Sequence, residues 1–129
     1  MRKKIFTLLL FSVSIVLFSQ EKLLSTKNQI CKYDFEKQLV SDCIESSNKS
    51  LVTIDLSSNT ISFETLGLTT AYFIKTKLEK VDGSRVFTVI SPSDGYVFDC
   101  VFFNEEKKVV LTQQQTQSKS SKQTTFFYQ

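Results

Sequence analysis

Asp94 and Asp99 are the closest that the sequence comes to a catalytic pair of carboxylates. A glycosidase needs two carboxylates that face one cleft at a defined separation, and this spacing along a strand does not guarantee such an arrangement. Asp94 falls in a predicted turn, whereas Asp99 lies on the opposite strand face from Phe98. We therefore interpret Asp94 as a turn-capping residue and Asp99 as a solvated one, and we expect no catalytic residues.

The sequence also lacks the residues that several other kinds of catalytic and metal-binding site require. The chain has no histidine, which excludes Ser-His-Asp and Cys-His nucleophile systems and histidine-ligated metal sites. Its three glycines do not form a phosphate-binding loop, and no spaced carboxylates resemble a calcium loop. The sequence therefore predicts a non-catalytic protein with no metal and no cofactor.

The N-terminus predicts export. Residues 1–19 begin with a short cationic stretch, continue with a mostly apolar run over residues 5–18 and end at Ser19, as a secretory signal peptide does. The apolar run is shorter than the roughly 20 residues that span a bilayer, although a retained membrane anchor is the alternative. We expect a secreted or periplasmic protein with no stable membrane insertion once the leader is removed.

The remainder, residues 20–129, is long enough for a single domain. Arg2, Lys3 and Lys4 lie in the leader, so 13 of the 16 basic residues remain against 13 acidic residues. A neutral domain gives no electrostatic reason to bind nucleic acid, and we expect none to be bound.

Export also changes how the three cysteines are interpreted, because oxidising compartments favour disulfides. Cys31 and Cys43 are the local pair and would face each other if residues 30–44 form a hairpin. Cys100 alternates with aromatic residues and is expected in the core. The sequence thus indicates a possible Cys31–Cys43 disulfide and one free thiol.

Apolar residues recur at every second position from Leu51 onward, which is the pattern of half-buried strands. Asp82-Gly83 is the strongest hairpin signal, and further turn residues separate short strands at regular spacing. The pattern predicts an all-β fold, a single antiparallel meander that closes into a small barrel or a two-layer sandwich. The layout resembles small exported bacterial β proteins, including lipocalin-like barrels, although no motif of a particular family is present.

Two segments lie outside this regular pattern. Residues 30–45 fit either the two strands of a hairpin or a short N-terminal helix near residues 34–45 that Asp34 would cap, and we favour the hairpin. The segment over residues 113–124 is rich in Gln, Ser, Thr and Lys, which predicts a flexible polar loop.

Aromatic residues suggest two functions. Neighbouring aromatic residues on a strand point to opposite faces, so each doublet exposes one ring unless something covers it. The first hypothesis is an exported binding or protein-interaction module whose unknown protein partner binds a surface formed by Phe73, Val101 and Phe103. The alternative is a lipocalin-like carrier that holds a small hydrophobic ligand among Tyr72, Phe98 and Phe102.

Overall fold

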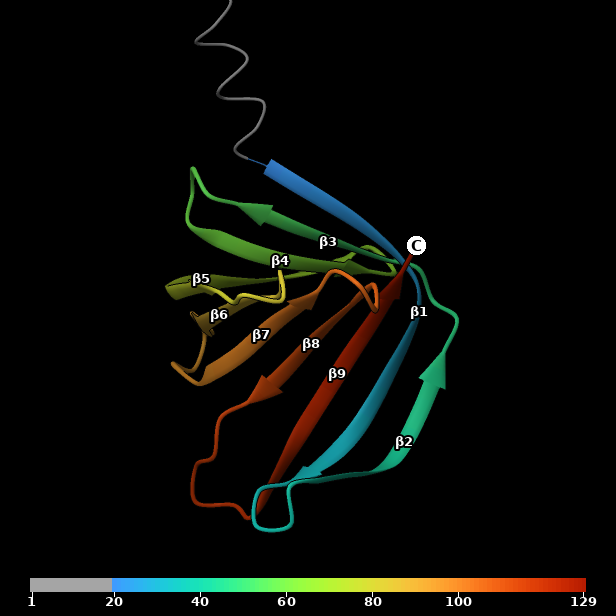
Figure 1. The fold of residues 1–129 in the computed structure, drawn as a ribbon, viewed down its shortest axis with the longest axis vertical. Coiled ribbons are helices and arrows are strands. Elements are labelled where there is room, and N and C mark those ends of the chain that lie inside the picture. The colour runs from blue at the N-terminus through green and yellow to red at the C-terminus, as the bar shows by residue number, and fades with distance from the viewer. Residues whose placement is uncertain (1–19) are drawn as a thin grey trace, which may run out of the picture.

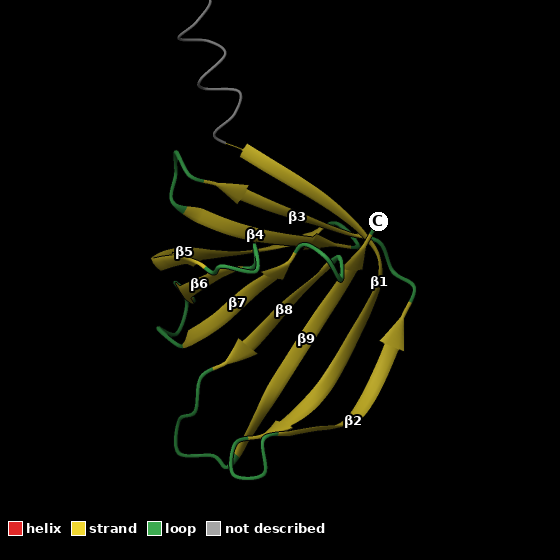
Figure 2. Cartoon of the chain, in the orientation of Figure 1, coloured by secondary structure: helices red, strands yellow, loops and turns green. Residues whose placement is uncertain are grey.

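The structure, a computed structural model, describes residues 20–129, and the predicted signal peptide over residues 1–19 lies outside them. Within this part of the chain, every regular element is a β-strand (Figures 1 and 2). None of these residues belongs to a helix of the length and apolar character that a membrane crossing requires. The strands are β1 (Gln20–Asp34), β2 (Leu39–Ser46), β3 (Ser50–Asp55), β4 (Thr60–Thr65), β5 (Leu68–Glu79), β6 (Arg85–Ile90), β7 (Val97–Phe103), β8 (Lys108–Gln113) and β9 (Ser120–Tyr128).

Eight of these strands close into an antiparallel barrel. From β3 to β9 each strand pairs with its neighbour in sequence, and β9 then pairs with β1, which also pairs with β3 (Figure 1). A register shift between Ser25 and Lys27 lets the first half of β1 pair with β3 and the second half with β9. Closure pairs strand edges that an open sheet would expose. The all-β prediction is confirmed, and of its two architectures the barrel is the one observed.

The ninth strand, β2, is added outside the barrel against the second half of β1. The two strands form the predicted hairpin, and the alternative helix near residues 34–45 is not formed. The Asp34 carboxylate, which would have capped that helix, instead accepts a hydrogen bond from the backbone N–H of Lys37 in the hairpin turn.

The predicted disulfide joins this hairpin. Cys31 on β1 and Cys43 on β2 are bonded, with their Cα atoms 4.1 Å apart. Cys100 is the free cysteine and is fully buried. A disulfide of this kind is compatible with an oxidising environment.

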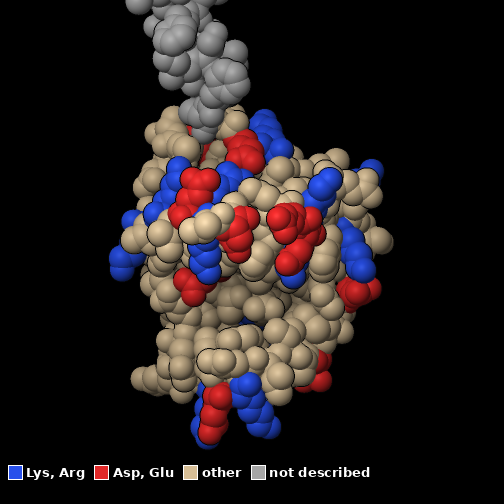
Figure 3. All heavy atoms as spheres, in the orientation of Figure 1, with Lys and Arg blue, Asp and Glu red and all other residues tan. Residues whose placement is uncertain are grey.

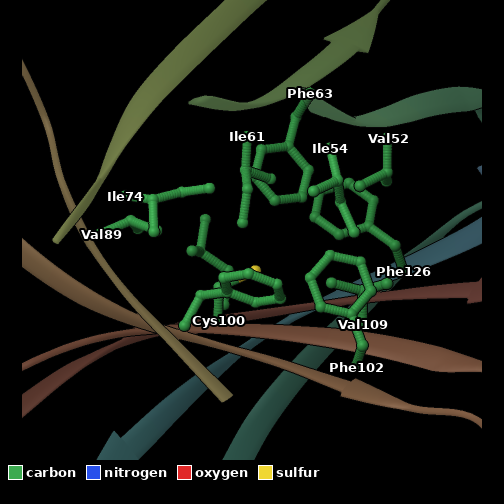
Figure 4. Packing of buried hydrophobic residues seen from close by; sticks show 12 residues of the cluster. Val52, Ile54, Ile61, Phe63, Ile74, Val89, Cys100, Phe102, Val109 and Phe126 are labelled. Carbon is green, nitrogen blue, oxygen red and sulfur yellow. The ribbon is translucent and has the colours of Figure 1, made fainter. Parts of the chain in front are cut away.

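The core lies inside the barrel. Alternate residues of β3, β4, β6, β7 and β8 point inward, as the period of two predicts, and side chains from opposite walls meet in the centre (Figure 4). The buried cluster consists of Val52, Ile54, Ile61, Phe63, Ile74, Phe87, Val89, Cys100, Phe102, Val109, Leu111 and Phe126. The alternation in the sequence therefore identified the interior face.

The polar segment near the C-terminus is more ordered than the sequence suggested. We expected a loop over residues 113–124, but β9 begins at Ser120, so the connection covers residues 114–119. Ser120 pairs with Asp34 of β1, and Gln123 pairs with both β1 and β8. The polar side chains are tolerated in this strand because its backbone groups are paired on the barrel wall.

Candidate functional site

One end of the barrel is hollow. A cavity of about 670 Å³ opens there, between the inner faces of β4, β5, β7, β8 and β9 and the loop that joins β6 to β7. Its apolar lining residues are Phe63, Leu66, Leu68, Tyr72, Tyr96, Phe98, Leu111 and Phe126. Figure 3 shows a hollow on the face in view, surrounded mostly by uncharged residues. The volume lies within the range of roughly 300–1,000 Å³ that small-molecule sites occupy.

Four aromatic rings form a continuous wall of this cavity. The ring centroids of Tyr72 and Phe98 are 5.1 Å apart, and those of Phe63 and Tyr72 are 5.8 Å apart, both pairs edge to face. Phe63 in turn stacks on Phe126 with a centroid separation of 4.9 Å. These separations are favourable for aromatic pairs, so the rings stabilise each other and present a firm apolar surface.

The register of the strands explains this arrangement. β4 and β5 are joined by a two-residue turn, Leu66-Gly67, and pair in register so that Phe63 lies opposite Thr70 and beside Tyr72. β5 pairs with β4 over its first half and with β6 only from Phe73 onward. The first half of β5 is therefore unpaired on the β6 side, which opens the barrel at this end.

The other end of the barrel is closed by charged and aromatic side chains. Arg85 on β6 donates hydrogen bonds of 2.6 and 3.1 Å to the carboxylate of Glu21 on β1. The guanidinium carbon lies 5.1 Å from the centroid of the Phe102 ring. The cavity lies at the opposite end, where β5 separates from β6.

Of the three residues that the sequence suggested for ligand contact, two line this cavity. Tyr72 and Phe98 form part of its wall. Phe102 lies toward the closed end, where it is fully buried and packs edge to face on Phe87 with a centroid distance of 5.5 Å. Phe102 does not line the cavity because it is four residues further along β7 than Phe98, beneath the Arg85–Glu21 pair.

The three residues suggested for a partner surface lie on the outside of the barrel, on separate cross-strand rows. Phe73 is 52% exposed and pairs with Ile90. Val101 is partly buried in register with Val110. Phe103, also partly buried, lies under the Lys108 ammonium group, 5.1 Å from its ring centroid.

Several polar groups complete the mouth of the cavity. The hydroxyls of Thr65, Thr70 and Thr124, the Gln113 amide, the Asp94 carboxylate and the Lys122 ammonium belong to residues that line it. Asp94 is already engaged, because its carboxylate accepts a hydrogen bond of 2.9 Å from the backbone N–H of Tyr96. Burial raises the pKa of the Tyr72 hydroxyl, so this phenol stays neutral and can donate a hydrogen bond near neutral pH.

The two carboxylates that the sequence singled out lie apart. Asp94 lines the cavity, whereas Asp99 lies on the outer face and accepts a hydrogen bond from the Gln114 amide, so the two carboxylates do not face one cleft. Burial raises the pKa of the Cys100 thiol well above its ordinary value, which keeps it protonated. Among residues 20–129, no three His, Cys, Asp or Glu side chains gather as metal ligands would.

Some lining residues were not anticipated from the sequence. Leu66 and Leu68 flank Gly67 in a hairpin turn, and two leucines in so tight a turn were a signal that could have been noticed. Lys122 falls within the polar segment predicted as a loop, so its place on the cavity wall had no local signal. Comparisons of the chain with protein-family models, with curated proteins and with solved structures find no match.

Proposed function

We propose that this protein is a non-catalytic carrier that binds a small hydrophobic molecule in the cavity at the open end of the barrel. The observation that carries the proposal is the wall formed by Phe63, Tyr72, Phe98 and Phe126 around a cavity of about 670 Å³. Apolar cavities with a few polar groups at the mouth are typical of small-molecule sites. Burial of an apolar ligand against these rings would provide the affinity.

The carrier would act outside the cytoplasm, secreted or in a periplasm. The Cys31–Cys43 disulfide supports this location, because such bonds persist in oxidising compartments. The signal-peptide pattern of residues 1–19 supports it independently.

The test uses a substitution that fills the cavity without disturbing the core. Thr70 on β5 lines the cavity and is exposed, so Thr70→Trp places a large ring in the space without removing packed atoms. Thr69→Trp is the matched control, since Thr69 is the exposed neighbour on the other strand face and does not line the cavity. The natural chain contains no tryptophan, so each variant also carries a single fluorescent reporter.

The readout is titration with the neutral fluorescent probe N-phenylnaphthylamine, together with native mass spectrometry of protein purified from its own host. We expect the natural chain and the Thr69→Trp variant to bind the probe equally, and Thr70→Trp to bind it at least about tenfold more weakly. Equal affinities for the two variants, or no binding by the natural chain and no bound mass, would contradict the proposal.

Our second candidate is a protein-interaction module on the outer face, which the exposure of Phe73 favours. Phe73 pairs with Ile90, which pairs with Val97, so the three residues form an apolar row across neighbouring strands. Exposed apolar surface of this kind is typical of protein contacts. Phe73→Ser and Phe103→Ser should then weaken capture of a partner from the native envelope or medium while the melting temperature stays nearly unchanged. A large fall in melting temperature would instead assign these rings to the packing of the barrel.

A further inference from the structure

Two lysines lie directly opposite each other at the mouth of the barrel. Lys32 on β1 and Lys122 on β9 are register partners in the antiparallel pair that closes the barrel. Their side chains share one strand face, because Lys122 lines the main cavity and both lysines line an adjoining groove of about 410 Å³. Ile30 and Ile44 also line this groove, so the apolar surface continues past the lysines.

Neither lysine has a partner within the described part of the chain. The ion pairs found there involve Lys27, Arg85 and Lys108, and no side-chain hydrogen bond or ion pair between described residues engages the ammonium group of Lys32 or Lys122. Like charges directly opposite each other in a sheet are destabilising. On the same strand β1, Lys27 is balanced by Glu45 of β2, at 3.2 Å, so the sheet does neutralise a lysine elsewhere.

The acidic residues near the lysines form no ion pair with them. Asp42 lines the groove but forms no ion pair with either lysine. Asp94 lines the main cavity and holds the backbone of Tyr96. Asp34, two residues beyond Lys32, accepts a hydrogen bond from the backbone N–H of Lys37 in the hairpin turn, which is the main cause of its lowered pKa, and the charge of Lys32 makes only a smaller contribution. Neither ammonium group therefore has an ion-pair partner among the described residues, and both can bind an external anion.

From this geometry we propose that the ligand is an anionic amphiphile, a molecule with one negatively charged headgroup and an apolar tail. The headgroup lies between the ammonium groups of Lys32 and Lys122, and the tail extends into the cavity against Phe126 and Phe63. Charge-assisted hydrogen bonds from the two lysines recognise the headgroup. This inference rests on the proposed carrier function and specifies the chemical class of its ligand.

The test compares three amphiphiles with the same tail, each below its micelle concentration, by isothermal titration calorimetry. They are decanoate, the neutral decanol and the cationic decyltrimethylammonium. We expect decanoate to bind about tenfold more tightly than decanol, and decyltrimethylammonium to bind more weakly than either. The preference of the natural chain for decanoate should shrink as the salt concentration rises, because salt screens exposed charges.

Substitutions then test whether the two lysines cause the preference for decanoate over decanol. Lys32→Gln combined with Lys122→Gln should reduce the affinity for decanoate to that for decanol and leave the affinity for decanol unchanged. Lys49→Gln is the matched control, since Lys49 is exposed in the connection between β2 and β3 and should change neither affinity.

The outcomes separate this inference from the function on which it rests. Equal binding of decanoate and decanol by the natural chain, or a preference for the cation, would overturn the anionic headgroup and leave the apolar cavity standing. Binding of none of the three would overturn both. The salt series uses the natural chain alone, so the inference can fail even if the double variant does not fold.

Discussion

The guanidinium of Arg85 on β6 and the carboxylate of Glu21 on β1 are joined by two hydrogen bonds, of 2.6 and 3.1 Å. The two strands are not neighbours in the barrel, so the pair spans its closed end. The contact with Glu21 raises the pKa of Arg85 and keeps it charged. Because Arg85 also covers the Phe102 ring, one side chain both closes the barrel and shields the core.

Replacing one partner of this pair should lower the free energy of unfolding more than replacing both partners. Glu21→Gln leaves a mostly buried guanidinium without its carboxylate, and we expect the free energy of unfolding to fall by about 1 kcal/mol, a small value because Glu21 is partly exposed. Arg85→Met in the same chain replaces the charge with an apolar side chain against Phe102 and should recover part of the loss. Urea denaturation of the two single variants and the double variant measures this coupling. Strictly additive effects would show that the pair does not contribute as a unit.

We expect the natural Leu66 to lower the stability of the fold and to raise the affinity for a ligand in the cavity. It adopts a φ of 53°, in the left-handed region that Gly and Asn favour, and 76% of it is exposed at the mouth of the cavity. Leu66→Asn gives the Asn-Gly sequence preferred in two-residue hairpin turns, and we expect the free energy of unfolding to rise by about 1 kcal/mol. The affinity for N-phenylnaphthylamine should fall, because an apolar contact at the mouth is lost.

Leu68→Asn is the control for that prediction. Leu68 is 77% exposed and lines the same mouth, but it lies in β5 with no positive φ. Its replacement should weaken binding without stabilising the protein. If both variants are destabilised to the same extent, the conformation of Leu66 is not a source of strain.

The disulfide should stabilise the protein by holding β2 against the barrel. Replacing both Cys31 and Cys43 with serine removes a constraint on a short loop, and the chain-entropy argument gives a loss of about 3 kcal/mol in the free energy of unfolding. Urea denaturation of the variant and of the oxidised natural chain measures this difference. In parallel, titration of thiols in denaturant without reductant should find one of the three cysteines free, Cys100. Three free thiols in the natural exported chain would contradict the pairing.

The sequence predicted the features of the fold that depend on residues close together in the chain. Alternation assigned Val52 and Cys100 to the interior, and Asp82-Gly83 marked a hairpin that the structure contains, with Gly83 at a φ of 86°. The pairing of β9 with β1 depends on residues about a hundred positions apart, and no local pattern encodes it. Lys122 became part of the candidate site only through that pairing.

Acid should weaken the turn between β3 and β4 through Asp55. Its carboxylate accepts hydrogen bonds from the hydroxyl of Ser57 and from the Gln20 amide, and these lower the pKa of Asp55 from its ordinary value to about 2. A carboxyl group with a lowered pKa in the folded state contributes stability above its unfolded pKa of about 4, and this contribution is lost as the pH falls through the folded value. The loss is therefore expected between about pH 4 and pH 2.

Asp55→Asn tests this window, because asparagine does not titrate. The variant should be less stable than the natural chain near neutral pH, and the difference should shrink as the pH falls from about 4 to about 2. Urea midpoints measured across this range provide the comparison. Asp34 and Asp82, whose pKa values are also lowered by turn hydrogen bonds, keep some acid sensitivity in the variant. Parallel pH profiles for the two proteins would mean that Asp55 contributes the same stability whether it is ionised or protonated.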